Sequence, residues 1–191
     1  MTNLFLSNDA HASFNLRFEH YLGPQVTANH FNHAKDYRMS DLPYPAPVVE
    51  LPRDGGDIFN IASVRPKAVV LFFYPKDNTP GCTKEAIGFT EAAAAFEQAN
   101  VCVIGVSKDS VKSHDKFVEK QNLGVILLSD EHGTTCEDFG VWKEKSMYGK
   151  AYMGIERSTF LIDGTGQVVR EWRKVKVPGH VDDVLEAAKS L

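Results

Sequence analysis

The sequence predicts an α/β protein with a mixed central sheet and helices on both faces. Short, almost wholly apolar runs, which are typical of strands buried on both faces, alternate with segments whose apolar residues recur at helical spacing. A hairpin and a closing helix follow this alternation, so part of the sheet is expected to be antiparallel. The length of 191 residues suits one ordinary domain and a short extension.

The chain divides at about residue 40. We expect residues 1–40 to be an N-terminal extension of unknown role, and residues 41–191 to be the folded domain. The extension holds four of the seven histidines, namely His11, His20, His30 and His33. Its apolar residues fit one helix that ends at Leu22-Gly23-Pro24, and they also fit a strand.

Two of these histidines raise the alternative of a metal site. His30 and His33, with Asp36 as a third ligand, have a spacing that metal ligands can use. Short histidine spacings are common, however, and no cysteine or further histidine completes the set. We therefore interpret the segment as a solvated or packed tail and expect no metal.

In the first half of the domain, each element follows from its apolar pattern. A short strand is expected over residues 47–51, and an Asp-Gly hairpin turn over 53–56. Residues 68–74 (AVVLFFY) read as a strand buried on both faces. A polar loop over 75–81 then leads into a helix over 82–99, whose apolar residues lie at helical spacing.

The second half continues the same alternation. We expect Phe117 and Val118 to face inward from a helix, and Trp142 and Trp172 to pack in the core or at its rim. The expected elements are, in order, a strand (101–107), a helix (111–121), a strand (125–128), a short helix (134–139), a hairpin (158–162 and 168–172) and a closing helix (181–191).

The clearest chemical signal lies where the long helix begins. Pro80 suits the first helical position, because its missing N–H costs nothing there, and Thr79 is the natural cap. Cys82 then falls in the first turn, beside unpaired backbone N–H groups and the positive end of the helix dipole. This position favours thiolate over thiol, so we interpret Cys82 as a reactive cysteine rather than a small buried hydrophobe.

Composition argues against several classes of partner. The formal net charge is −4 without clusters of Lys or Arg, so neither nucleic acid nor an anionic membrane surface is an expected partner. No apolar run approaches the roughly 20 residues of a membrane span. The three cysteines are odd in number and contain no CxxC pair. The N-terminal residues lack the basic and apolar regions of a signal peptide. We expect a cytoplasmic protein with free thiols.

At this point the sequence resembles a known family. The run FYPKDNTPGCTKEA (residues 73–86) looks like the active-site loop of peroxiredoxins, specifically of the peroxiredoxin Q/bacterioferritin comigratory protein subfamily. A bare TxxC would be a weak signal, but this context, with an arginine just before a late strand, is specific. The similarity covers roughly residues 44–191 and continues through residues 104–107, 128–130, 139–142, 154–157 and 160–163.

The resemblance implies a thioredoxin-like fold and a thiol peroxidase that reduces hydrogen peroxide and organic hydroperoxides without a cofactor. By the same resemblance, Cys82 matches the peroxidatic cysteine, Thr79 the loop threonine and Arg157 the active-site arginine. Pro75 would shield the site, and Glu85 would orient Arg157.

The residue types fit this chemistry. Complete ionisation of an ordinary thiol increases its reactivity at neutral pH by at most about 30-fold. The larger contribution should come from donors aimed at the peroxide oxygens, namely the Arg157 guanidinium, the Thr79 hydroxyl and the backbone N–H groups of Gly81 and Cys82. As alternatives, Arg157 pairs with a surface carboxylate, Thr79 serves only as a cap, and Glu85 is only a first-turn carboxylate favoured by the dipole.

Completion of the cycle departs from the family pattern. Many members carry a resolving cysteine five positions after the peroxidatic one, where this chain has Ile87. Cys102 lies in a strand expected to be buried, whereas Cys136 is expected to be partly exposed and is a possible resolving cysteine. We favour a one-cysteine cycle in which thioredoxin, glutaredoxin or glutathione reduces the sulfenic acid.

Two other functions stay open. Oxidation of Cys82 in a non-catalytic redox sensor or binding module would change a partner surface without turnover. A disulfide reductase is disfavoured, because Cys82-Thr83-Lys84-Glu85 lacks the second cysteine of a CxxC pair. The resemblance favours a monomer or weak dimer.

Overall fold

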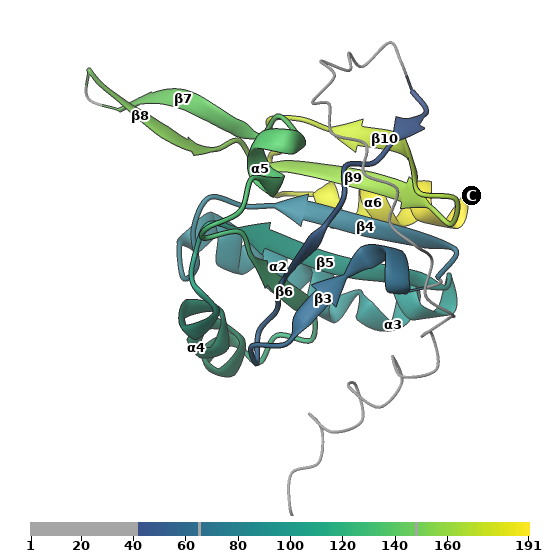
Figure 1. Ribbon diagram of the computed structural model, residues 1–191. Helices are drawn as coiled ribbons and strands as arrows, with labels where there is room; N and C mark the ends of the chain where they lie inside the picture. Colours follow the sequence, from purple (N-terminus) through teal and green to yellow (C-terminus); the bar gives the residue numbers. More distant parts are fainter. Residues whose placement is uncertain (1–41, 65, 148) are drawn as a thin grey trace, which may run out of the picture.

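The computed structural model describes residues 42–64, 66–147 and 149–191, and its centre is a six-stranded mixed sheet (Figure 1). The predicted extension, with His30, His33 and Asp36, lies outside the described residues. The strands lie in the order β1 (Tyr44–Pro45), β10 (Gln167–Trp172), β9 (Ser158–Asp163), β4 (Ala68–Phe73), β5 (Val101–Ser107) and β6 (Ile126–Ser129).

Strand direction divides the sheet into two halves. β4, β5 and β6 are parallel, whereas β9, β10 and β1 pair antiparallel. Every residue of β4 and β5 is buried, as expected for strands covered on both faces. The predicted mixed sheet is therefore confirmed, and its central strands are displaced from their predicted bounds by one residue at most.

Both faces of the sheet are covered, but unequally. α2 (Pro80–Glu91), α3 (Ala93–Gln98), α4 (Val111–Gln121) and α6 (His180–Lys189) cover one face. The other carries α5 (Thr135–Asp138) and the small hairpin of β2 (Glu50–Pro52) and β3 (Ile58–Asn60), followed by the 3-10 turn η3 (Ile61–Ser63). Alternate β4 residues serve the two cores, with Phe72 on the four-helix side and Phe73 on the α5 side.

The helix predicted over residues 82–99 is two helices that meet at Ala92. Helix propensity gives no reason for a break in this alanine-rich stretch. The Thr90 hydroxyl donates to the Ala86 carbonyl at 2.8 Å and accepts the Gly124 N–H at 3.1 Å. A hydroxyl bonded to the carbonyl four residues earlier bends helices, which accounts for the interruption two residues after Thr90.

A second hairpin was missing from the prediction. β7 (Trp142–Met147) pairs with β8 (Lys150–Ile155), and the two extend away from the body of the protein (Figure 1). Most of β8 is exposed, including Tyr152 and Met153. Because neither face of this arm is covered for most of its length, its sequence lacks the alternation that marks a half-buried strand.

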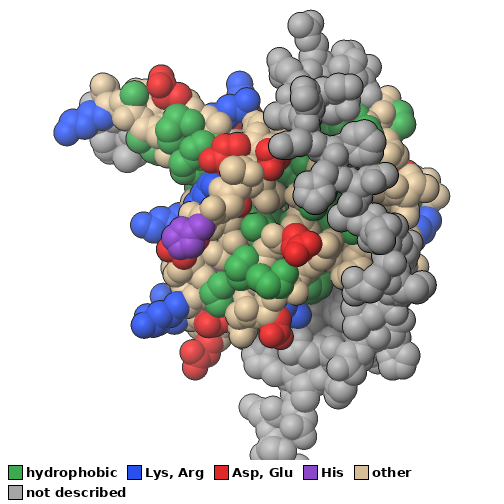
Figure 2. All heavy atoms as spheres, viewed as in Figure 1, with side chains coloured by type: hydrophobic (Ala, Val, Ile, Leu, Met, Phe, Trp, Pro, Cys, Tyr) green, Lys and Arg blue, Asp and Glu red, His purple; other side chains and the backbone are tan. Residues whose placement is uncertain are grey.

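The surface carries charges of both signs. On the face drawn in Figure 2, Lys and Arg side chains lie among Asp and Glu side chains. Within the described ranges, no helix is both long and apolar enough to cross a membrane.

Candidate active site

Sheet register brings the predicted site residues to one edge. Phe73, the last residue of β4, pairs with Val106 on one side and with Ser158, the first residue of β9, on the other. The loop that leaves β4 toward Cys82 therefore starts beside Arg157, which directly precedes β9. Residues 75 positions apart in the sequence meet at the carboxyl end of β4.

Cys82 lies in the first turn of α2, as predicted, and its side chain is 1% exposed. Pro80 is the first residue of this helix, and the first intrahelical bond runs from the Thr83 N–H to the Thr79 carbonyl. The N–H groups of Gly81 and Cys82 precede that bond, so the helix itself provides no acceptor for them. They are oriented as donors for a group with negative charge at the helix start.

Arg157 contacts the sulfur directly. Its Nη2 lies 3.2 Å from the Cys82 Sγ, and its Nη1 forms an ion pair with the Glu85 carboxylate. A Cβ atom on Gly81 would lie 3.3 Å from Nη2, so glycine allows the guanidinium to approach the helix closely. The guanidinium fork thus bridges Cys82 and Glu85, one turn apart on α2.

Glu85 is completely buried, with Oε2 on Arg157 and Oε1 without a hydrogen-bond partner in the described part of the chain. Burial raises the pKa of Glu85 to about 7, although Arg157 opposes the shift. The alternative of an exposed first-turn carboxylate is wrong, because Glu85 is buried and lies beyond the first turn of α2. Its orienting role stays a prediction.

Thr79 differs in part from the expectation. It is the N-cap residue of α2, but its side chain makes no capping hydrogen bond. Its hydroxyl instead donates to the Lys76 carbonyl at 3.0 Å, so in this geometry it offers acceptor lone pairs to an incoming group. Pro75 follows Tyr74 at the start of the loop and is exposed, and its shielding role stays a prediction.

The other two cysteines lie on the far side of the sheet. Cys82 packs in the core under the four helices, whereas Cys102 and Cys136 pack in the core under α5. The predicted partial exposure of Cys136 is wrong, because α5 turns its side chain inward and leaves it 0% exposed. Burial raises the pKa of Cys102 to about 12 and raises that of Cys136 further. In this conformation neither thiol faces Cys82.

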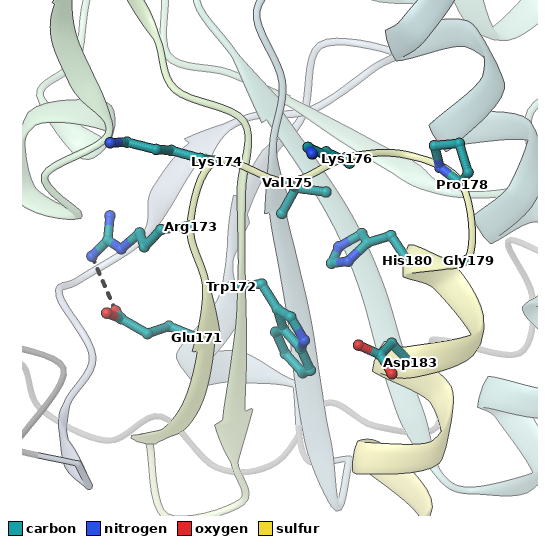
Figure 3. A pocket seen from close by; sticks show the side chains of 10 residues that line it. All are labelled: Glu171, Trp172, Arg173, Lys174, Val175, Lys176, Pro178, Gly179, His180 and Asp183. Atoms are coloured by element: carbon teal, nitrogen blue, oxygen red, sulfur yellow. Dashed lines mark hydrogen bonds and ion pairs between the residues drawn. The ribbon is translucent and has the colours of Figure 1, made fainter.

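A shallow pocket lies beside the site, between β10 and the start of α6 (Figure 3). Trp172, Val175 and His180 line it, and the Val175 N–H donates to the Arg157 carbonyl at 2.9 Å. His180 Nε2 lies 2.7 Å from the Thr159 hydroxyl. Trp172 packs against the four-helix core, as predicted.

His180 makes the stability of the fold depend on pH. Burial lowers its pKa from 6.5 to about 4; Asp183 opposes this shift and Arg157 adds to it. The unfolded chain then binds this proton below about pH 6.5 and the folded chain does not, so stability present at neutral pH is lost as the pH falls toward 4. The loss amounts to at most about 3 kcal/mol.

His180→Gln tests this effect, because glutamine keeps a polar atom near Thr159 and does not titrate. We expect the free energy of unfolding in urea to fall less between pH 7 and pH 5 in this variant than in wild type. His132→Gln is the control, since the His132 side chain is 90% exposed. Equal losses in wild type and His180→Gln would refute the role of His180.

Fold and site together define a class of protein, the thioredoxin-fold peroxiredoxins, in which a cysteine at a helix start contacts an arginine. Residues 43–171 match the model of the AhpC/TSA family, and the chain belongs to this family, within its Bcp/peroxiredoxin Q group. The predicted thioredoxin-like fold is thereby confirmed. No three His, Cys, Asp or Glu side chains gather into a metal site within the described ranges.

Relatives and solved structures agree with this assignment. The chain is 49% identical over 146 residues to the peroxiredoxin Bcp of Bacillus subtilis, which covers 76% of this chain and 93% of that protein. A structure of Xanthomonas campestris peroxiredoxin Q superposes with a TM-score of 0.71 at 48% identity, covering 74% of this chain and 90% of that one. A Xylella fastidiosa PrxQ mutant gives 0.70 at 44% identity, covering 85% and 98%.

Proposed function

We propose that this chain is a thiol peroxidase that reduces hydrogen peroxide and organic hydroperoxides at Cys82. The observation that carries the proposal is the 3.2 Å contact between Arg157 Nη2 and the Cys82 sulfur at a helix start. Solved complexes of the Xanthomonas campestris bacterioferritin comigratory protein concern the alkyl peroxide reduction activity of that protein. We extend that substrate class to this chain.

The first half-reaction oxidises the sulfur. The Cys82 thiolate attacks one peroxide oxygen, an S–O bond forms as the O–O bond breaks, and hydroxide or alkoxide leaves and takes up a proton. The product is the Cys82 sulfenic acid. The Arg157 guanidinium and the Gly81 and Cys82 N–H groups stabilise the charge that develops on the oxygens, while Thr79 accepts a hydrogen bond from the protonated peroxide oxygen.

The second half-reaction needs a thiol from outside the chain. Ile87 occupies the position of the usual resolving cysteine, and Cys102 and Cys136 are buried in the other core. We therefore propose a one-cysteine cycle: a first external thiol displaces water from the sulfenic acid to give a mixed disulfide, and a second thiol releases reduced Cys82. Thioredoxin, glutaredoxin and glutathione are the proposed donors, in a cytoplasmic protein that is a monomer or weak dimer.

Repeated turnover separates this function from that of a redox sensor. With hydrogen peroxide or an organic hydroperoxide in excess, we expect catalytic consumption when thioredoxin with its reductase, or glutathione with its reductase and glutaredoxin, is added. Loss of NADPH absorbance reports each turnover. Consumption of only a single equivalent of peroxide in both systems would favour the non-catalytic sensor and contradict the proposal.

A further inference from the structure

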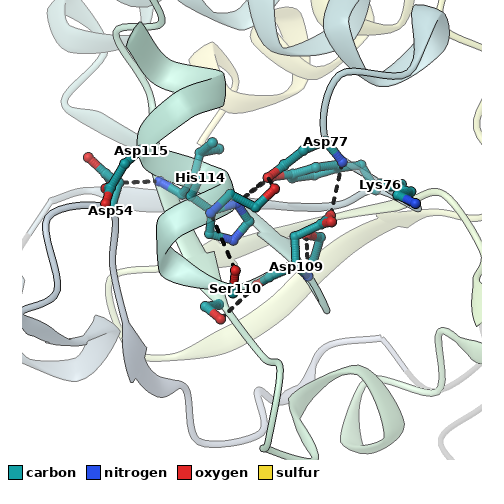
Figure 4. A network of polar contacts seen from close by, with 12 residues as sticks. Asp54, Lys76, Asp77, Asp109, Ser110, His114 and Asp115 are labelled. Atoms are coloured by element: carbon teal, nitrogen blue, oxygen red, sulfur yellow. Dashed lines mark hydrogen bonds and ion pairs between the residues drawn. The ribbon is translucent and has the colours of Figure 1, made fainter.

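The active-site loop contains a buried carboxylate that makes no contact with the reacting sulfur. Asp77 is 6% exposed and lies between the end of β4 and the start of α2. Its Oδ1 accepts a hydrogen bond from the Tyr74 hydroxyl at 2.8 Å. Its Oδ2 accepts one from the Ser113 hydroxyl at 2.7 Å and faces His114 Nδ1 at 3.0 Å (Figure 4).

These contacts connect the loop to other elements. Ser113 and His114 belong to α4, and Figure 4 shows His114 pointing from that helix toward Asp77. The backbone N–H of Asp77 donates to Asp109 Oδ2 at 2.9 Å, and the same oxygen accepts the hydroxyl of Ser107 at the end of β5. One loop residue is thus held by its side chain to α4 and by its backbone to the carboxyl edge of the sheet.

His114 faces the Asp77 carboxylate through its Nδ1. The imidazole is completely buried, and its Nε2 has no hydrogen-bond partner among the described residues. The ionised Asp77 carboxylate can only accept hydrogen bonds, so the 3.0 Å contact requires a proton on Nδ1, which gives Asp77 a directed donor. Although burial acts to raise the pKa of Asp77, hydrogen bonds from His114, Ser113 and Tyr74 hold it below its ordinary value.

We propose that Asp77 and His114 are positioning residues: their buried pair anchors the active-site loop to α4 and sets where a peroxide lies between Thr79 and Cys82. Arg157 is held to α2 through Glu85. The Thr79 backbone caps α2, but its hydroxyl is held by the carbonyl of Lys76, the loop residue next to Asp77. Displacement of the loop therefore moves the Thr79 hydroxyl relative to the Arg157 guanidinium and the N–H groups at the start of α2. The inference rests on the proposed peroxidase function.

The test separates alignment of peroxide from reactivity of the thiol. Asp77→Asn removes the carboxylate, and His114→Leu removes the donor. His114→Asn is the matched control, because asparagine has nearly the shape of leucine and keeps a donor near the Nδ1 position. For each folded variant, we would measure the second-order rate constant of Cys82 oxidation by hydrogen peroxide and that of Cys82 alkylation by iodoacetamide, which needs a thiolate but no aligned oxygens.

We expect Asp77→Asn and His114→Leu to oxidise about 10- to 100-fold more slowly than wild type, and to be alkylated no more slowly. His114→Asn should recover most of the oxidation rate. Wild-type oxidation in folded His114→Leu would overturn the inference, and so would equal losses in both reactions. If His114→Leu does not fold, Ser113→Ala replaces it, because this change removes one donor from the same Asp77 oxygen. If wild-type Cys82 itself fails to react with peroxide, the proposed function fails instead.

Discussion

Cys82→Ser will abolish catalytic consumption of peroxide, whereas Cys102→Ser and Cys136→Ser will keep most of it. A serine hydroxyl is not ionised beside Arg157 at neutral pH, so the variant lacks the nucleophile even with every donor in place. The other two thiols are buried in the opposite core with raised pKa values. Steady-state peroxide consumption with an excess of external thiol measures all three variants.

The Cys136→Ser variant also tests the one-cysteine cycle. In the proposed cycle its turnover depends on the external thiol in the same way as that of wild type. Loss of its turnover, together with an intramolecular disulfide in oxidised wild type, would show that α5 opens and that Cys136 resolves Cys82.

Arg157→Lys will lower the rate constant for oxidation of Cys82 by peroxide by about 100-fold or more. The guanidinium contacts the Cys82 sulfur through Nη2 and the Glu85 carboxylate through Nη1. A single ammonium keeps the positive charge but cannot reproduce this planar fork, so it loses either the sulfur or its orienting carboxylate. Stopped-flow oxidation with equimolar peroxide gives the rate constant.

Arg173→Lys is the matched control for this change. Arg173 is also a partly buried arginine on a carboxylate, Glu171, but its guanidinium lies over Phe160, which belongs to the α5-side core. We expect the rate constant for oxidation of Cys82 in the Arg173→Lys variant to match that of wild type. Equal effects at Arg157 and Arg173 would indicate a general loss of stability rather than loss of a donor at the sulfur.

Much of the fold follows from local patterns. The runs that form β4 and β5 are apolar along their whole length because both faces are covered, and the helix start at Pro80 follows from the fixed φ and missing N–H of proline. Contacts between residues that are far apart in the sequence could not be predicted from these local patterns. The contact of Arg157 with Cys82 was expected only from the family resemblance, and sheet register now explains it. The β7–β8 arm carried no periodic signal, because solvent surrounds most of it.

Two features of the protein could be found only in the three-dimensional structure. The Asp77–His114 pair joins a loop to a helix 37 residues later, and a lone histidine on a helix gives no sign of its partner. The burial of Cys136 was also missed, because the short α5 follows a polar Gly-Thr-Thr loop that suggested exposure. Which side of the sheet α5 covers depends on the path of the chain and not on its local sequence.

Mass spectrometry of the protein after one equivalent of hydrogen peroxide tests the central claim most directly. We predict that the added oxygen is found on the Cys82 sulfur as a sulfenic acid, trapped by dimedone, with Cys102 and Cys136 unmodified and no intramolecular disulfide. In a parallel sample without dimedone, addition of reduced thioredoxin should release the oxygen as water and restore the thiol. Oxidation at either other cysteine while Cys82 stays reduced would contradict the assignment of Cys82 as the attacking residue.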